Sequence, residues 1–123
     1  MNQILLTATT AAHEAGNIIH SLYHSEYEVK MKGKGNPVTD ADIAADDKLK
    51  EILTTEFPNY GWLSEETRDT PDRLTKRRVW VVDPIDGTKE FVEGIPNFVV
   101  SIGLVENGTP ILGVIHNPIN KDT

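Results

Sequence analysis

The residues Trp80-Val81-Val82-Asp83-Pro84-Ile85-Asp86-Gly87-Thr88-Lys89-Glu90-Phe91 form the most informative stretch of the sequence. With Val79 in front, its first residues make a continuous apolar run, which predicts a buried strand over residues 79–82. Pro84 fixes φ and lacks a backbone donor, so we expect the chain to turn once the strand has delivered Asp83. Asp86 would then fold back beside Asp83.

The same stretch predicts a binding function. Gly87 permits backbone conformations that other residues resist, and the N–H groups of Gly87 and Thr88 would point at one place, as at a helix N-terminus that binds phosphate. Carboxylates hold cations, and cations together with amide donors hold an anion, which suits metal-assisted phosphate chemistry. The alternative is structural, because Asp-Gly is a common turn dipeptide and the segment could be only a strand-ending turn.

Composition limits the classes of protein to consider. The chain has 123 residues, no cysteine and a formal charge of −7, which is typical of one soluble domain and excludes disulfides, thiolate zinc sites and a cysteine nucleophile. The acidic excess argues against a nucleic-acid polymer or an anionic membrane as partner. No apolar run approaches the roughly 18 residues of a membrane span, and no basic n-region of a signal peptide is present. Cytoplasm is therefore the expected location.

Most of this charge lies in residues 40–70, where nine acidic residues stand against three basic ones for a local net of −6. A solvated helix face with an acidic loop accounts for most of them. The alternative is that a few of them collect divalent cations, which prefer carboxylate oxygens. Composition alone does not choose between the two.

Periodic apolar residues predict two helices in the first half. One runs from about residue 3 to 24, and the second begins at Thr39 or Asp40 and ends before Pro58. The apolar side of the second helix is expected to consist of Ile43, Leu49, Ile52, Leu53 and Phe57. A short strand is expected over residues 28–32, broken by Gly33, Gly35, Asn36 and Pro37. Its lysines are interpreted either as protection of a strand edge or as part of a mobile loop that approaches an anionic substrate.

The second half is predicted to be rich in strands. A short strand is expected over residues 60–63, a polar connection over 67–78, and strands over 79–82, 98–105 and 111–115. Asn107-Gly108 is a strong hairpin signal between the last two. Since the helices come first and the strands follow, the order predicts an α+β fold with two helices packed on a largely antiparallel sheet.

Three segments of the sequence resemble motifs of a known protein family. The segment over residues 80–91 is similar to Trp-x-x-Asp-Pro-(Ile/Leu)-Asp-Gly-Thr-x-x-Phe, the signature of the Mg²⁺-dependent, lithium-sensitive phosphatases of the inositol monophosphatase family. Leu63-Ser64-Glu65-Glu66 resembles the family's Gly-Glu-Glu segment with Ser64 in place of Gly, and the segment over 37–42 resembles its Val-Thr-x-x-Asp segment. The three motifs occur in the family's order. The resemblance implies the N-terminal half of the family's layered α/β sandwich.

The resemblance also implies residue roles. Glu65, Asp83 and the backbone carbonyl of Ile85 would bind a first Mg²⁺, and Asp83 would bridge to a second Mg²⁺ that Asp86 also binds. Asp42 would pair with the hydroxyl of Thr88 and, with Glu65, orient the attacking water. The amides of Gly87 and Thr88 would hold phosphate oxygens. The implied reaction is hydrolysis of a phosphate monoester by two-metal activation of water.

Within the family, Asp-Gly-Thr-Lys-Glu-Phe and Leu-Ser-Glu-Glu resemble the 3′(2′),5′-bisphosphate nucleotidase branch, with Lys89 and Glu90 as local support. The implied substrate is adenosine 3′,5′-bisphosphate, with an inositol or sugar phosphate as the competing interpretation. A hypothesis of another class is a non-catalytic module that binds metal or anion. Retention of both Asp42 and Thr88 favours the enzyme, because those residues serve water activation.

The resemblance carries an expectation about length. Family members run to about twice this length, and their second half supplies a further Asp to the second metal. Residues 1–123 are therefore expected to form the N-terminal metal-binding α+β domain, with the C-terminal half absent. A small phosphorylated molecule is the expected partner, and a second copy of the chain is a candidate partner because exposed sheet edges favour self-association.

Overall fold

The computed structural model describes residues 2–22, 29–32, 36–64, 71–86, 98–119 and 123, and for residues 22, 29–32, 36–40, 71, 72 and 86 it describes the backbone alone. The elements follow the chain in the order α1 (Asn2–Leu22), β1 (Val29–Lys32), β2 (Asn36–Thr39), α2 (Asp40–Glu56), β3 (Gly61–Ser64), the 3₁₀ helix η1 (Pro71–Thr75), β4 (Arg78–Asp86), β5 (Val99–Glu106) and β6 (Thr109–His116). Both predicted helices and the predicted strands are confirmed as elements.

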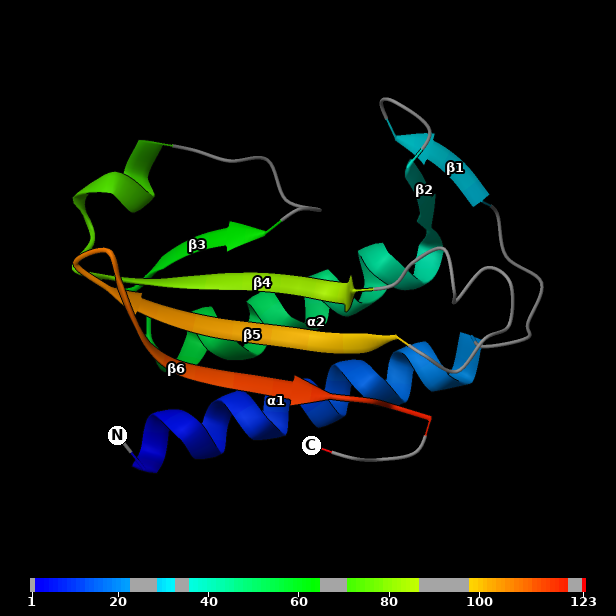
Figure 1. Cartoon of the computed structure of the whole chain (residues 1–123), viewed down its shortest axis with the longest axis horizontal. Helices are drawn as coiled ribbons and strands as arrows, with labels where there is room; N and C mark the ends of the chain where they lie inside the picture. Colours follow the sequence, from blue (N-terminus) through cyan, green and yellow to red (C-terminus); the bar gives the residue numbers. More distant parts are fainter. Residues whose placement is uncertain (1, 23–28, 33–35, 65–70, 87–97, 120–122) are drawn as a thin grey trace.

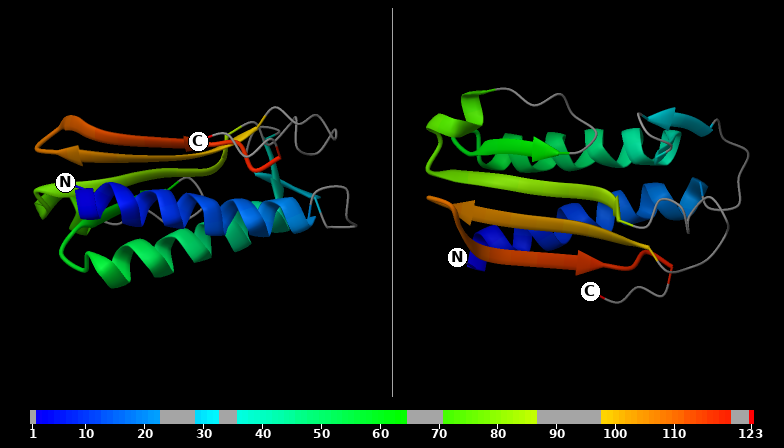
Figure 2. Two further views of the ribbon diagram at one scale, coloured as in Figure 1. Left: turned by 90° about the horizontal axis from the view of Figure 1, so that it is seen from below. Right: turned by 45° about the horizontal axis from the view of Figure 1, so that its top comes forward.

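The two helices lie side by side on one face of a four-stranded sheet, as Figures 1 and 2 show. The apolar stripe of α1 consists mostly of small residues, and Ala8, Ala11, Ala12 and Ala15 are fully buried. Small side chains let the backbones of the two helices approach closely. Among the described residues, no helix is long and apolar enough to cross a membrane.

The buried side of α2 differs from the predicted one. Leu49 and Leu53 are buried as expected, but Ile43 is 43% exposed, and Ala41 and Ala45 take its place in the core. Ile43 was expected to be buried because it is hydrophobic, and this prediction was wrong. The actual stripe steps through positions 41, 45, 49 and 53, a four-residue spacing that keeps one helix face toward the sheet.

The main sheet has the strand order β3-β4-β5-β6. β3 pairs parallel with β4, and the other two pairings are antiparallel, so the prediction of a mainly antiparallel sheet is confirmed with one parallel edge. Asn107 (φ 50°) and Gly108 (φ 82°) both adopt left-handed backbone between β5 and β6. Positive φ at both central residues matches the hairpin turn expected for Asn-Gly.

A separate two-stranded sheet precedes α2 (Figure 1). β1 confirms the strand predicted over residues 28–32. That strand ends at Lys32, in agreement with the predicted break, but Asn36 and Pro37 begin a strand that was not predicted, since β2 pairs antiparallel with β1 over Asn36–Thr39. Proline is tolerated in such a strand, since a two-stranded ribbon consists entirely of edges.

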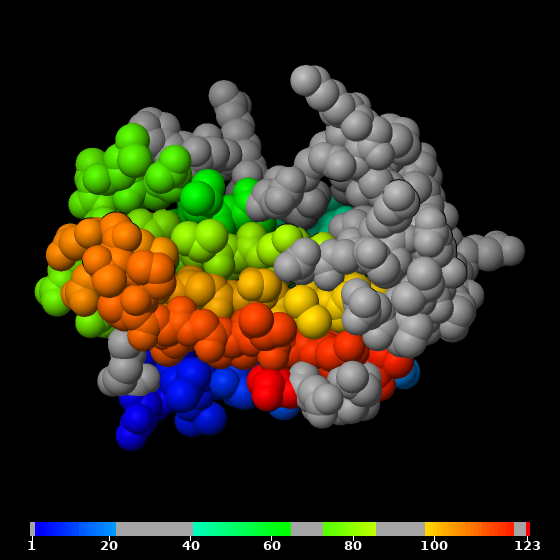
Figure 3. All heavy atoms as spheres, viewed as in Figure 1, coloured from blue at the N-terminus to red at the C-terminus, as the bar shows by residue number. Residues whose placement is uncertain are grey.

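Successive residues of β4 point to opposite faces of the main sheet. Trp80 and Val82 face the helices and are buried, whereas Val81 is 40% exposed on the outer face. In Figure 3 the strands β4, β5 and β6 form the front of the molecule, while α1 shows along its lower edge. The prediction of a fully buried strand over residues 79–82 was therefore wrong for Val81, because the helices of the described chain cover one face only.

Candidate active site

The site begins where β4 loses its regular pairing with β5. The register passes from Asp83↔Ser101 to Asp86↔Val99, so three steps on β4 face two steps on β5. This is the residue count of a β-bulge, a feature common beside active sites. The expected turn at Pro84 was wrong, since β4 continues to Asp86.

The bulge has a local cause in the sequence. Pro84 has no N–H for the ladder, and proline is accommodated within sheets at bulges or edges. β3 ends at Ser64, which pairs with Val82. Beyond Val82, no strand among the described residues pairs with β4 on the side of β3. Both Pro84 and Ile85 are buried, which breaks the alternation of the strand just before Asp86.

Asp83 lies on the outer face at this end of the sheet. It is half-buried and lines an open pocket of about 360 Å³ together with Leu63, Val81 and Ser101. A carboxylate at the wall of an open pocket is accessible to a cation and to a small anionic molecule. The structure thus places the first aspartate of the motif where binding chemistry is feasible.

Helix α2 brings two further acids to the same end of the molecule. Asp42 and Asp46 are 2% and 3% exposed, and their spacing of four residues puts them on one helix face. Asp46 accepts a hydrogen bond from the hydroxyl of Ser64, the residue that pairs with Val82. Figure 1 shows the start of α2 beside the end of β4.

Asp46 was missed by the sequence reasoning, although a signal for it exists. It stands in register with the buried Leu49 and Leu53, three and seven residues later. A charged residue in the apolar stripe of a helix is costly to bury and is rarely placed there without a partner. That mismatch of residue type and position could have singled it out.

Part of the predicted site lies outside the described residues. This applies to Glu65, Gly87 and Thr88, and to the side chain of Asp86. Of the predicted metal donors, the structure describes the carboxylate of Asp83 and the backbone of Ile85. Both are oxygen donors, the chemistry that Mg²⁺ prefers, so these two fit a magnesium site. The described residues alone contain no group of three His, Cys, Asp or Glu side chains able to hold a metal.

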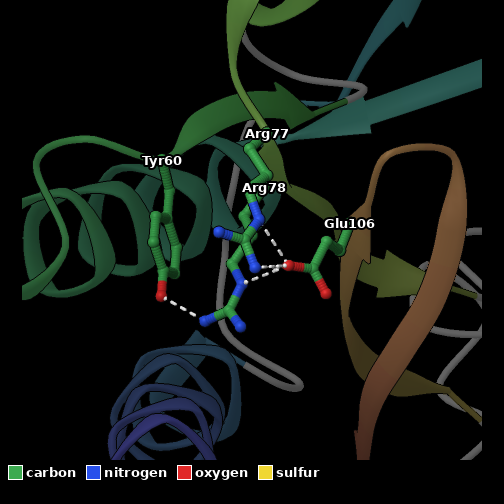
Figure 4. A network of polar contacts seen from close by, with 4 residues as sticks. All are labelled: Tyr60, Arg77, Arg78 and Glu106. Carbon is green, nitrogen blue, oxygen red and sulfur yellow. Dashed lines mark hydrogen bonds and ion pairs between the residues drawn. The ribbon is translucent and has the colours of Figure 1, made fainter.

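The opposite end of β4 has a different kind of charge cluster, shown in Figure 4. Arg77 Nε donates to Glu106 Oε1 at 2.6 Å, and Arg78 Nη1 donates to the hydroxyl of Tyr60 at 2.9 Å. The hydrogen bond from Arg77, assisted by the charge of Arg78, holds the pKa of Glu106 below its ordinary value. The bond to Tyr60 raises the pKa of Arg78. This end is an ion-paired surface, in contrast to the acids gathered at the other.

Comparison with known proteins agrees with this geometry. A family model described as the inositol monophosphatase family matches residues 1–123. An inositol monophosphatase of Mesembryanthemum crystallinum is 37% identical over 124 residues, which cover 99% of this chain and 46% of that protein. The 3′(2′),5′-bisphosphate nucleotidase CysQ of Haemophilus influenzae is also 37% identical, over 100% of this chain and 45% of that protein.

The same likeness extends to three dimensions. The extragenic suppressor protein suhB of Bartonella henselae matches with a TM-score of 0.91 at 34% identity, over 97% of this chain and 46% of that one. The chain spans about half the length of the curated relatives it matches. The family model matches every residue, and an inositol monophosphatase and a bisphosphate nucleotidase match at the same 37% identity. The chain therefore belongs to the inositol monophosphatase family.

Proposed function

We propose that this chain carries the N-terminal, metal-binding part of a Mg²⁺-dependent phosphate monoester hydrolase. The observation that carries the proposal is the bulge of β4 directly after Asp83, whose side chain lines an open pocket. The buried acids of α2 lie at the same end of the sheet and add negative potential there.

The proposed roles follow the motif residue by residue. Glu65, Asp83 and the carbonyl of Ile85 would hold one Mg²⁺, and Asp83 with Asp86 would hold a second. When bound, Mg²⁺ lowers the pKa of a water molecule and offsets the charge of the phosphate.

The remaining roles concern water and phosphate. Asp42 would accept a hydrogen bond from the Thr88 hydroxyl and, with Glu65, would orient the water for in-line attack. The deep burial of Asp42 suits this task, because a carboxylate inside the protein keeps one orientation and solvent competes less for its hydrogen bonds. The backbone N–H groups of Gly87 and Thr88 would hold the phosphate oxygens.

We further propose adenosine 3′,5′-bisphosphate as the substrate. Ser64 before Glu65, and Lys89-Glu90 after Thr88, support the nucleotidase branch. An inositol or sugar monophosphate is the second candidate, because an inositol monophosphatase matches at the same 37% identity as a nucleotidase. The cytoplasm is the proposed location, and a second copy of the chain is a proposed partner through exposed sheet edges.

The test is phosphate release by the whole chain from adenosine 3′,5′-bisphosphate and from an inositol monophosphate, with and without Mg²⁺. We expect Mg²⁺-dependent release that Asp83→Asn lowers by at least about 100-fold, since even indirect partners of a metal cost 10–100-fold. Asp47→Asn is the matched control, because Asp47 is an exposed acid on the same helix as Asp42. Mg²⁺ binding without release from either compound would uphold the metal-binding role and reject turnover by residues 1–123 alone, because the second half of the relatives is expected to supply a further metal ligand.

A further inference from the structure

The contact between Asp46 and Ser64 joins the helix layer to the sheet at the candidate active site. The hydroxyl of Ser64 donates to Oδ1 of Asp46, and both residues are buried, with 6% and 3% of their surface exposed. A hydrogen bond between two buried groups does not compete with water. The contact is therefore a firm link between α2 and β3 in a region where water does not compete.

The position of Ser64 determines which part of the sheet this hydrogen bond holds in place. Ser64 is the last residue of β3 and pairs with Val82 of β4. Along the chain, Glu65 follows Ser64 directly and Asp83 follows Val82 directly. The hydrogen bond thus holds the end of β3 to α2, beside the residue of β4 that directly precedes the proposed Mg²⁺ donor Asp83.

The residue types point the same way. The neighbours of Asp46 in the buried stripe of α2 are Ala45, Leu49 and Leu53, all fully buried. An apolar residue at position 46 would suit that stripe without the cost of burying a carboxylate. The Gly-Glu-Glu segment of the family has Gly at the position of Ser64. Glycine has no side chain to bond Asp46, so the hydroxyl of Ser64 makes the link.

We propose that Asp46 is a positioning residue: through Ser64 it fixes the end of β3 against β4 and so holds Asp83, the residue of β4 that follows Val82, in place for the metal. This inference rests on the proposed function, because it assigns Asp46 a task in the same magnesium site. Asp46 acts through Ser64 and touches no reacting atom. Its removal should therefore weaken Mg²⁺ binding in a protein that remains folded.

The test is calorimetric titration of the whole chain with Mg²⁺, without substrate, together with thermal unfolding in the absence of metal. Ser64→Ala removes the donor, and we expect it to weaken Mg²⁺ binding about 10-fold, as loss of an indirect partner commonly does. Ser64→Thr keeps the hydroxyl and should bind within about 2-fold of the unaltered chain. Asp46→Asn keeps an oxygen acceptor but no charge, and should fall between them.

Thr54→Ala is the matched control, because the Thr54 hydroxyl is bonded to the Lys50 carbonyl on the exposed side of the same helix. Mg²⁺ affinity unchanged in both Ser64→Ala and Asp46→Asn, with only the melting temperature lowered, would overturn the inference. Asp83→Asn in the same titration separates it from the proposed function. Binding lost in Asp83→Asn but kept in Ser64→Ala would uphold the metal site and reject the role of Asp46, whereas no Mg²⁺ binding by the unaltered chain would reject both.

Discussion

The two faces of the main sheet are built from alternate residues of the same strands, yet they meet different surroundings. The inner face packs against α1 and α2, and its residues Trp80, Ile102 and Leu104 are almost completely buried. The outer face carries Val81 at 40% and Ile115 at 61% exposure, with neither α1 nor α2 over it (Figure 2). Both faces are apolar, so apolar character alone does not show which face stabilises this chain.

The contrast also separates stability from function. The inner face holds the core, while the outer face holds the half-buried Asp83 and its open pocket. A substitution on the inner face should therefore be measured in free energy of unfolding. A substitution near Asp83 should be measured in metal binding and turnover.

The largest stability effect is expected from Leu104→Ala on the inner face. Leu104 is fully buried, and truncation of such a leucine costs about 2–5 kcal/mol through lost burial and the cavity it leaves. Val105→Ala, one residue along on the outer face, should cost less than about 1 kcal/mol, because Val105 is only half-buried. Urea unfolding of the two variants checks this, and equal losses would contradict the comparison.

A smaller effect is expected where the helix layer meets β6. A Cβ at Gly16 would lie 2.9 Å from Cδ2 of the buried His116 and 3.2 Å from Cβ of Pro118. Overpacking costs about 1–3 kcal/mol, and the better helix propensity of alanine returns about 1 kcal/mol. Gly16→Ala should therefore lose about 1 kcal/mol in urea unfolding.

Gly113 supplies the matched control on the outer face. A Cβ there would meet no atom within 4 Å, so Gly113→Ala should be neutral or slightly stabilising. If Gly113→Ala destabilised the chain as much as Gly16→Ala, then the outer face would not be as open as described.

The smallest effect is expected from the ion-paired cluster at the start of β4, which belongs to neither face. The lowered pKa of Glu106 means that its pairing with Arg77 stabilises the fold above the ordinary carboxyl pKa and is lost as the pH falls through the lowered value. Glu106→Gln should thus lower the melting temperature slightly near neutral pH. The difference from the unaltered chain should vanish in strong acid, and a difference that grows on acidification would show the sign to be wrong.

The sequence predicted local structure well because local structure depends on near neighbours. The 3.6-residue period gave both helices, and Asn107-Gly108 gave the hairpin through its tolerance of positive φ. The motif around Asp83 led to the family. Errors arose where one residue has two interpretations, as for Pro84, which forms a bulge within β4 where a turn was expected, and for Asn36 and Pro37, which belong to β2.

The sequence by itself determined the kinds of elements, the family and the candidate ligands, because these depend on residue types and short spacings. Only the tertiary structure decided that β3 pairs parallel with β4, that Asp46 is buried against Ser64, and that Val81 faces outward. Each of these depends on contacts between residues far apart in the chain or on which face the helices cover. A continuous apolar run such as residues 79–82 contains no information about which of its two faces will be covered.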